Sequence, residues 1–287
     1  MTAAILPVRR NLQFHLPADR ISNWNGGGTH WTQFLNTLSI FFPAGERFFI
    51  QSIRNYRNQI SDPELKKAVA AFIGQEAFHT REHEEYNEAM ANAGLQTEKM
   101  EKVVEDLLDN LQKILPKSLQ LAATVALEHL TAMMAELVLT DDHFFENSDE
   151  RYHALWQWHA MEETEHKGVA YDVFETVIGT GPRAYVTRSA AFIVANVIFW
   201  SLFYRFYYKV LKAENQHLNL RGWLKSLNYQ FGRKGMMSRM LPEWLDFFRP
   251  SFHPWDKDNS FHLQQAEELM QQVDKFAEQV GLVASAA

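Results

Sequence analysis

Two copies of the pattern Glu-x-x-His constrain the fold of this chain more than any other feature. The copies are Glu76-Ala77-Phe78-His79 and Glu163-Thr164-Glu165-His166. On an α-helix, residues three apart lie on the same face, so each copy can direct a carboxylate and an imidazole at one point. Two further carboxylates, Glu46 and Glu128, lie within apolar stretches that are typical of helices. The four features fall on four different predicted helices and are expected to meet inside a bundle.

This combination of side chains predicts a metal centre. One Glu from each of two helices, plus Glu-x-x-His from each of two others, is the ligand set of a two-metal four-helix bundle. A buried carboxylate costs several kcal/mol unless its charge is matched. The structural alternative is that one Arg or Lys pairs with each of Glu46 and Glu128. Arg47 is not the expected partner of Glu46, because adjacent residues point to different faces of a helix.

The available donor atoms restrict the metal. The chain contains no cysteine, which excludes disulfides, thiolate catalysis and thiolate-bound zinc or iron–sulfur clusters. Histidine and carboxylate ligands suit non-haem iron or manganese, so two Fe ions are expected, with Mn or a mixed Fe/Mn pair as alternatives. Zinc remains open, because two-metal hydrolases also use these ligands.

Additional histidines lie near both motifs. His159 precedes Glu163 by four residues and therefore lies on the same helical face. It is expected to be a seventh metal ligand, the alternative being an imidazole that hydrogen-bonds a ligand carboxylate. His83, one turn beyond His79, is expected to orient a ligand or to face the substrate.

Three other polar residues are expected to lie outside the ligand set. His129 adjoins Glu128 but must point about 100° away from it on a helix. Glu162 and Glu165 flank the second motif on other helical faces. They are expected to be solvated or paired with cations.

The positions of helix-starting and helix-ending residues predict an all-α fold. Helix-starting residues occur at 61–64 and 148–149, and helix-ending Gly or Pro residues occur at 94, 116 and 179. Helices are expected at about 43–59, 62–93, 98–115, 117–140 and 149–178, with a further amphipathic helix at 258–281. Three regions follow from this pattern. They are an irregular N-terminal segment (1–40), a di-metal four-helix bundle (41–180) and a helical C-terminal extension that packs on the bundle (181–287).

The extension contains sixteen residues without charge, 189–204. As a helix this stretch is about 24 Å long, short of the roughly 30 Å of a bilayer core. It is expected to pack against the bundle or at a subunit interface, which favours a homodimer. A peripheral membrane contact is the alternative.

Overall charge bears on partners and location. The formal net charge is −7, which argues against a nucleic-acid partner. The apolar run at the start of the chain is too short for a signal peptide, and Arg9 and Arg10 follow it rather than precede it. A cytoplasmic protein is expected.

The motifs resemble those of two groups of proteins. Over about residues 40–180 the arrangement is similar to the ferritin-like di-iron carboxylate superfamily. Three segments, at 42–46, 75–83 and 158–167, resemble the bacterial family catalogued as predicted metal-dependent hydrolases, over nearly the whole chain. His159 is similar to the seventh ligand of arylamine N-oxygenases. That resemblance implies the ligands Glu46, Glu76, His79, Glu128, His159, Glu163 and His166.

Two relatives fit less well. Radical-generating ribonucleotide reductase subunits usually place a tyrosine where this chain has His83, which disfavours a tyrosyl radical. Ferritins are shorter and lack the hydrophobic extension, which disfavours iron storage.

Three functions follow as hypotheses. The first is an O₂-activating di-iron oxygenase or oxidase that acts on an apolar or amine-bearing small molecule and needs an electron donor that the sequence does not identify. The second is a binuclear hydrolase, in which metals acidify water without redox change. The third is a non-enzymatic helical bundle with paired buried charges.

Overall fold

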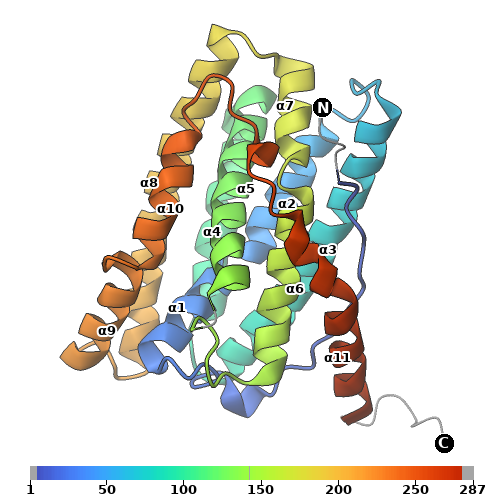
Figure 1. The fold of residues 1–287 in the computed structure, drawn as a ribbon. Helices are drawn as coiled ribbons and strands as arrows, with labels where there is room; N and C mark the ends of the chain where they lie inside the picture. Colours follow the sequence, from blue (N-terminus) through green and yellow to red (C-terminus); the bar gives the residue numbers. More distant parts are fainter. Residues whose placement is uncertain (1–4, 142, 280–287) are drawn as a thin grey trace, which may run out of the picture.

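The protein is all-helical over residues 5–141 and 143–279, the parts that the computed structural model describes (Figure 1). The expected all-α class is therefore confirmed. The helices are α1 (Thr29–Ser39), α2 (Phe42–Arg54), α3 (Pro63–Asn92), α4 (Thr97–Ile114), α5 (Lys117–Thr140), α6 (Glu150–His166), α7 (Val169–Ile178), α8 (Pro182–Ala213), α9 (Leu220–Phe231), α10 (Met236–Asp246) and α11 (Ala266–Gln279). Short 3₁₀ turns occur at Ala18–Arg20, Pro254–Asp256 and Ser260–Gln265.

Helices α2, α3, α5 and α6 form the central bundle. α2 packs along α3 and α5, while α6 packs along α5 and α3, so the four helices enclose one core. α7 continues from α6 and contacts α3 and α5, and α8 lies against α5 and α1. The bundle with extra C-terminal helices thus has the predicted architecture.

The expected helix ends of the bundle are largely confirmed. The Asp62 side chain accepts a hydrogen bond from the backbone N–H of Glu64, and Pro63 is the first residue of α3. Gly94 (φ +90°) follows α3, and Gly179 (φ +96°) ends α7. Glycine has no Cβ to clash in this left-handed conformation, so it favours these stops. Helix α2 ends at Arg54, before the expected end near residue 59.

The N-terminal region is more ordered than the sequence predicts. Residues 29–39, inside the segment expected to be irregular (1–40), form helix α1, in which residues 30–39 are all buried. The helix carries polar side chains among apolar ones because it is covered on several sides, including by α8, α3 and α9. It therefore lacks the one-sided apolar stripe that identifies a surface helix.

The second motif ends a helix instead of lying in the middle of one. We expected a single helix from 149 to about 178, but α6 stops at His166 and α7 starts at Val169. A Cβ added at Gly168 would lie 2.8 Å from the indole of Trp255. The helix is therefore interrupted where Trp255 of the C-terminal extension packs closely against Gly168. Trp255 is distant in the sequence from this glycine.

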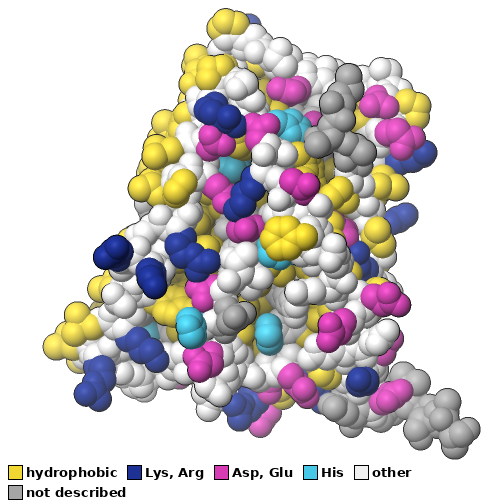
Figure 2. Space-filling view, in the orientation of Figure 1, with side chains coloured by type: hydrophobic (Ala, Val, Ile, Leu, Met, Phe, Trp, Pro, Cys, Tyr) yellow, Lys and Arg dark blue, Asp and Glu magenta, His cyan; other side chains and the backbone are white. Residues whose placement is uncertain are grey.

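The hydrophobic stretch 189–204 lies within α8, which is longer and more exposed than expected. Within the described residues, two helices, α5 and α8, are long and apolar enough to span a membrane; the apolar part of α5 is 72% buried and that of α8 only 22%. Val186, Ile193, Val194 and Val197 are exposed. Hydrophobic side chains gather along the edge of the molecule where α8 lies (Figure 2). Packing against the bundle therefore covers only one side of α8.

The segment 258–281 also differs from one continuous helix. It contains the 3₁₀ turn Ser260–Gln265 followed by α11, and residues 280–281 lie outside the described residues.

Candidate metal centre

All seven predicted ligands lie in the core of the bundle. Glu46 comes from α2, the first motif from α3, Glu128 from α5, and His159 with the second motif from α6. Their side chains are buried, with no residue more than 3% exposed. The prediction that the two single Glu residues and the two Glu-x-x-His motifs lie on four separate helices is confirmed.

Together with His83, their donor atoms form four overlapping groups of three, in each of which the atoms lie within 4.8 Å of one another. The groups are Glu76, Glu128, His166; Glu46, Glu76, His79; His79, His159, Glu163; and Glu46, His83, His159. Because the groups share members, the side chains form one continuous cluster. Such a cluster has enough donors for more than one ion.

Glu163 lies between the two ends of this cluster. Its Oε1 is 3.1 Å from Nε2 of His159 and 3.8 Å from Nδ1 of His79. Its other oxygen, Oε2, is 3.5 Å from Nε2 of His166, and accepts a hydrogen bond from the Thr131 hydroxyl at 2.5 Å. One carboxylate oxygen thus faces each end, which is the arrangement that a bridging carboxylate needs.

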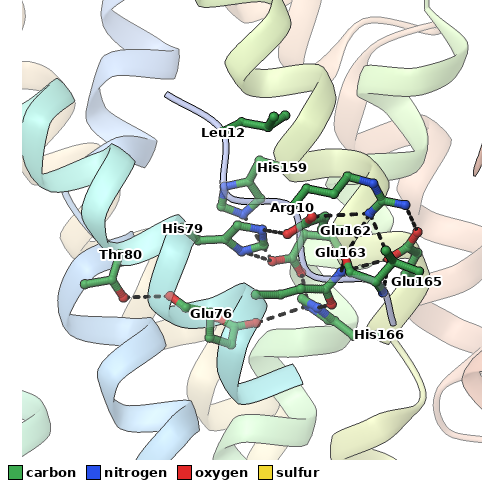
Figure 3. A network of polar contacts seen from close by, with 12 residues as sticks. Arg10, Leu12, Glu76, His79, Thr80, His159, Glu162, Glu163, Glu165 and His166 are labelled. Carbon is green, nitrogen blue, oxygen red and sulfur yellow. Dashed lines mark hydrogen bonds and ion pairs between the residues drawn. The ribbon is translucent and has the colours of Figure 1, made fainter. Parts of the chain in front are cut away.

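His79 is held by a carboxylate on its outer side. Its Nε2 lies 3.1 Å from Oε2 of Glu162, while its Nδ1 faces the cluster without a hydrogen-bond partner. Glu162 is held in turn by the guanidinium of Arg10 at 3.3 Å (Figure 3). Burial raises the pKa of Glu162 to about 8, although Arg10 opposes the shift. A carboxylate on the outer nitrogen fixes the ring so that the inner nitrogen can bind metal.

His166 is oriented in the same way by an amide. Its Nδ1 donates to Oε1 of Gln75 at 3.0 Å, and its Nε2 lies 3.1 Å from Glu76 and 3.5 Å from Glu128. Gln75 donates to Oε2 of Glu165 at 2.8 Å.

The third imidazole, His159, is held by another histidine. Nε2 of His83 lies 2.7 Å from Nδ1 of His159, and Nδ1 of His83 lies 2.9 Å from the hydroxyl of Ser39. The outer nitrogen of His159 is thus occupied, and its Nε2 faces Glu163. His83 thus contacts a predicted ligand, and its role in orienting that ligand stays a prediction. His83 itself also belongs to one of the donor groups.

The cluster fits metal ions because many of its inward atoms lack partners. Both carboxylate oxygens of Glu46, Glu76 and Glu128 are buried without a hydrogen bond, as is Nε2 of His166. Burial raises the pKa of these three carboxyl groups well above the usual range, and nearby carboxylates raise it further. Burial alone would also raise the pKa of Glu163, but His166 and His159 hold it well below the usual range. Bound cations would satisfy the unpaired oxygens and offset their repulsion.

Some residues around the centre were not predicted. Glu162 and Glu165 are paired, as expected, but they are buried rather than solvated. Their common partner, Arg10, lies in the N-terminal segment; its Nη2 is 2.6 Å from Oε1 of Glu165. The backbone N–H of Val8 also donates to Glu165. No local pattern in the sequence joins residue 10 to residues 162–165, so only the fold reveals this pairing.

His129 and Arg47 have partners away from the donor cluster. His129 donates from Nε2 to the carbonyl oxygen of Glu243 at 3.2 Å. Arg47 pairs with Glu84 at 2.6 Å instead of with Glu46.

Comparison with known proteins identifies the family. Residues 8–258 match the family described as predicted metal-dependent hydrolase. The chain belongs to this family. No curated protein and no solved structure matches the chain. Membership in the family supports metal dependence, in agreement with the donor groups at the bundle core.

Proposed function

We propose that this family member is an O₂-activating non-haem di-iron enzyme, an oxygenase or oxidase with a ferritin-like centre. The observation that carries the proposal is the donor set: four carboxylates and three imidazoles, all buried. In this set the oxygens of Glu46, Glu76 and Glu128, and one inward nitrogen each of His79 and His166, have no hydrogen-bond partner. These nitrogen and oxygen donors suit iron or manganese. A reduced metal pair, when bound, supplies the two electrons that activate O₂, and an external donor must restore them.

Different residues of the cluster would hold each of the two metal ions. Glu76, Glu128 and His166 would hold one ion, and His79, His159 and Glu163 would hold the other. Glu46 shares a donor group with Glu76 and His79, so it lies between these two trios. Burial of the site excludes bulk water from the reaction. An apolar or amine-bearing small molecule is the proposed substrate.

A binuclear hydrolase is the second candidate, and the family description favours it. The same residues would hold two ions that supply a nucleophilic water without redox change. The two candidates differ in their metal requirement. A hydrolase should remain active with zinc, whereas an O₂-activating enzyme should be inactive with it.

Anaerobic loading with Fe(II), followed by rapid mixing with O₂, tests the first candidate. We expect oxygen consumption and a transient optical absorption. Glu128→Ala should bind one iron or none and lose the signal, while Glu136→Ala, a change on the same helix outside the cluster, should keep it. Two bound irons that neither consume O₂ nor change the spectrum would exclude O₂ activation. Hydrolytic activity of the zinc form would then establish the second candidate.

A further inference from the structure

An apolar groove lies beside the metal centre, between α2, α4, α5 and α8. Its volume is about 490 Å³, within the range of pockets that hold small-molecule ligands. Leucines of α4 and alanines of α8 line much of it. The polar side chains along it are Glu46, Thr131 and Thr187.

The groove reaches the metal centre at its floor. Glu46, which lines the groove, is 1% exposed and has two unpartnered oxygens. Thr131, also in the lining, donates to Glu163. The ring of Phe42 lies 4.5 Å from that of His159, measured between centroids, and faces the groove as well. A molecule in the groove would therefore extend to the predicted ligands.

The shape of the groove is elongated. Its lining on α8 extends from Val186 to Leu202, which at 1.5 Å per residue is about 24 Å. On α5 it extends from Leu119 to Met134, about 22 Å. Ala123, Ala191 and Ala195 are small, so the space between the helices is left open. Among the described residues that line the groove, only Glu46, at the floor, is ionisable.

We propose that this groove binds a long unbranched hydrocarbon chain and presents a carbon of that chain at Glu46. The inference rests on the proposed function, because it takes the metal centre as the reacting centre. A groove lined mainly by apolar side chains matches an alkyl chain along most of its length and offers few partners for polar groups. A second copy of the protein is a poorer occupant, since the groove descends to a ligand that is buried inside the bundle.

Equilibrium binding of straight-chain alcohols, from octanol to hexadecanol, to the full-length protein tests this assignment. Each added methylene should tighten binding by about fourfold until the groove is full. Adamantanol, a compact apolar alcohol, should bind weakly. Equal affinity across the series, or tighter binding of adamantanol, would overturn the proposal.

Two substitutions that fill the groove locate the binding site. Ala191→Trp and Ala195→Trp should each reduce the affinity for hexadecanol by at least tenfold. Val197→Trp, on the exposed side of α8, is the matched control and should bind as the unchanged protein does. Unaltered affinity in either folded groove variant would overturn the proposal. If the two groove variants lose the dimer in sedimentation and the unchanged protein binds no alcohol, the groove is instead occupied by a second copy.

The chain-length measurement does not depend on redox chemistry. Alcohol binding together with a silent reaction with O₂ would keep the groove assignment and reject the proposed oxygenase. Normal O₂ consumption without alcohol binding would reject the groove assignment alone.

Discussion

His83 lies 2.7 Å from His159, Nε2 to Nδ1, and this contact determines which nitrogen of His159 faces the metal centre. The opposite nitrogen, Nε2, is 3.1 Å from Oε1 of Glu163. His79 and His166 are held in the same manner, by Glu162 and Gln75. Each imidazole therefore has its outer nitrogen engaged and its inner nitrogen directed at the carboxylates. Such outer contacts fix the tautomer and the orientation of metal-binding histidines.

Replacement of His159 by Ala shows whether His159 binds metal or only orients the carboxylate of Glu163. If His159 is a ligand, His159→Ala should retain two irons, because six protein ligands remain, but should change the rate or spectrum of the O₂ reaction. If it only orients Glu163, metal affinity should fall by about 10–100-fold. Iron stoichiometry and stopped-flow absorption on the same variant distinguish these results. His153→Ala, on the same helix, is the control. Unchanged binding and an unchanged spectrum would place His159 outside the centre.

Arg10 should contribute strongly to stability. It is 8% exposed and pairs with Glu162 and Glu165, both buried. Arg10→Ala leaves two buried carboxylates without their cation, which typically costs about 3–5 kcal/mol. Urea denaturation of the metal-free protein measures the loss. Arg9→Ala, at an exposed neighbour, should have little effect; an equal loss in both variants would contradict the role assigned to Arg10.

Glu82 should make stability depend on pH. Burial raises its pKa to about 7 despite the adjacent Arg81, and it accepts a hydrogen bond from the backbone N–H of Phe14. Because the folded state holds the proton more tightly, the stability from this group is fully present below about pH 4.5. It is lost as the pH rises through about 7, by up to about 3 kcal/mol. In Glu82→Gln, the decline in unfolding free energy between these pH values should be smaller. An identical pH profile would refute this assignment.

The exposed face of α8 predicts the state of the protein in solution. Ile193 and Val197, which do not line the groove, are 48% and 62% exposed, so a second copy that covers this side would bury apolar surface. We expect a homodimer that is soluble without detergent and leaves membranes on a salt wash. Sedimentation and membrane fractionation measure both properties. Retention in the membrane after alkaline extraction would instead indicate insertion of α8.

The parts of the structure that sequence predicts are those with local signals. Asp62, Pro63 and Gly94 delimit α3 through contacts within a few residues, and three-residue spacing alone aligns Glu76 with His79. Helix α1 was missed because polar residues such as Gln33 and Asn36 are buried inside it, which removes the amphipathic pattern.

Other features depend on distant contacts. The break after His166 occurs where Gly168 approaches Trp255. The burial of Glu162 and Glu165 depends on Arg10, more than 150 residues away. No local sequence pattern relates residues so far apart in the chain, so these contacts are visible only in the folded structure. The division into 1–40, 41–180 and 181–287 as separate regions stays a prediction.

Anomalous scattering from crystals of the iron-loaded protein tests the two-metal centre most directly. We expect two iron peaks inside the bundle. One should lie among Glu76, Glu128 and His166 and the other among His79, His159 and Glu163. A single peak, no peak, or iron only at the surface would contradict the account.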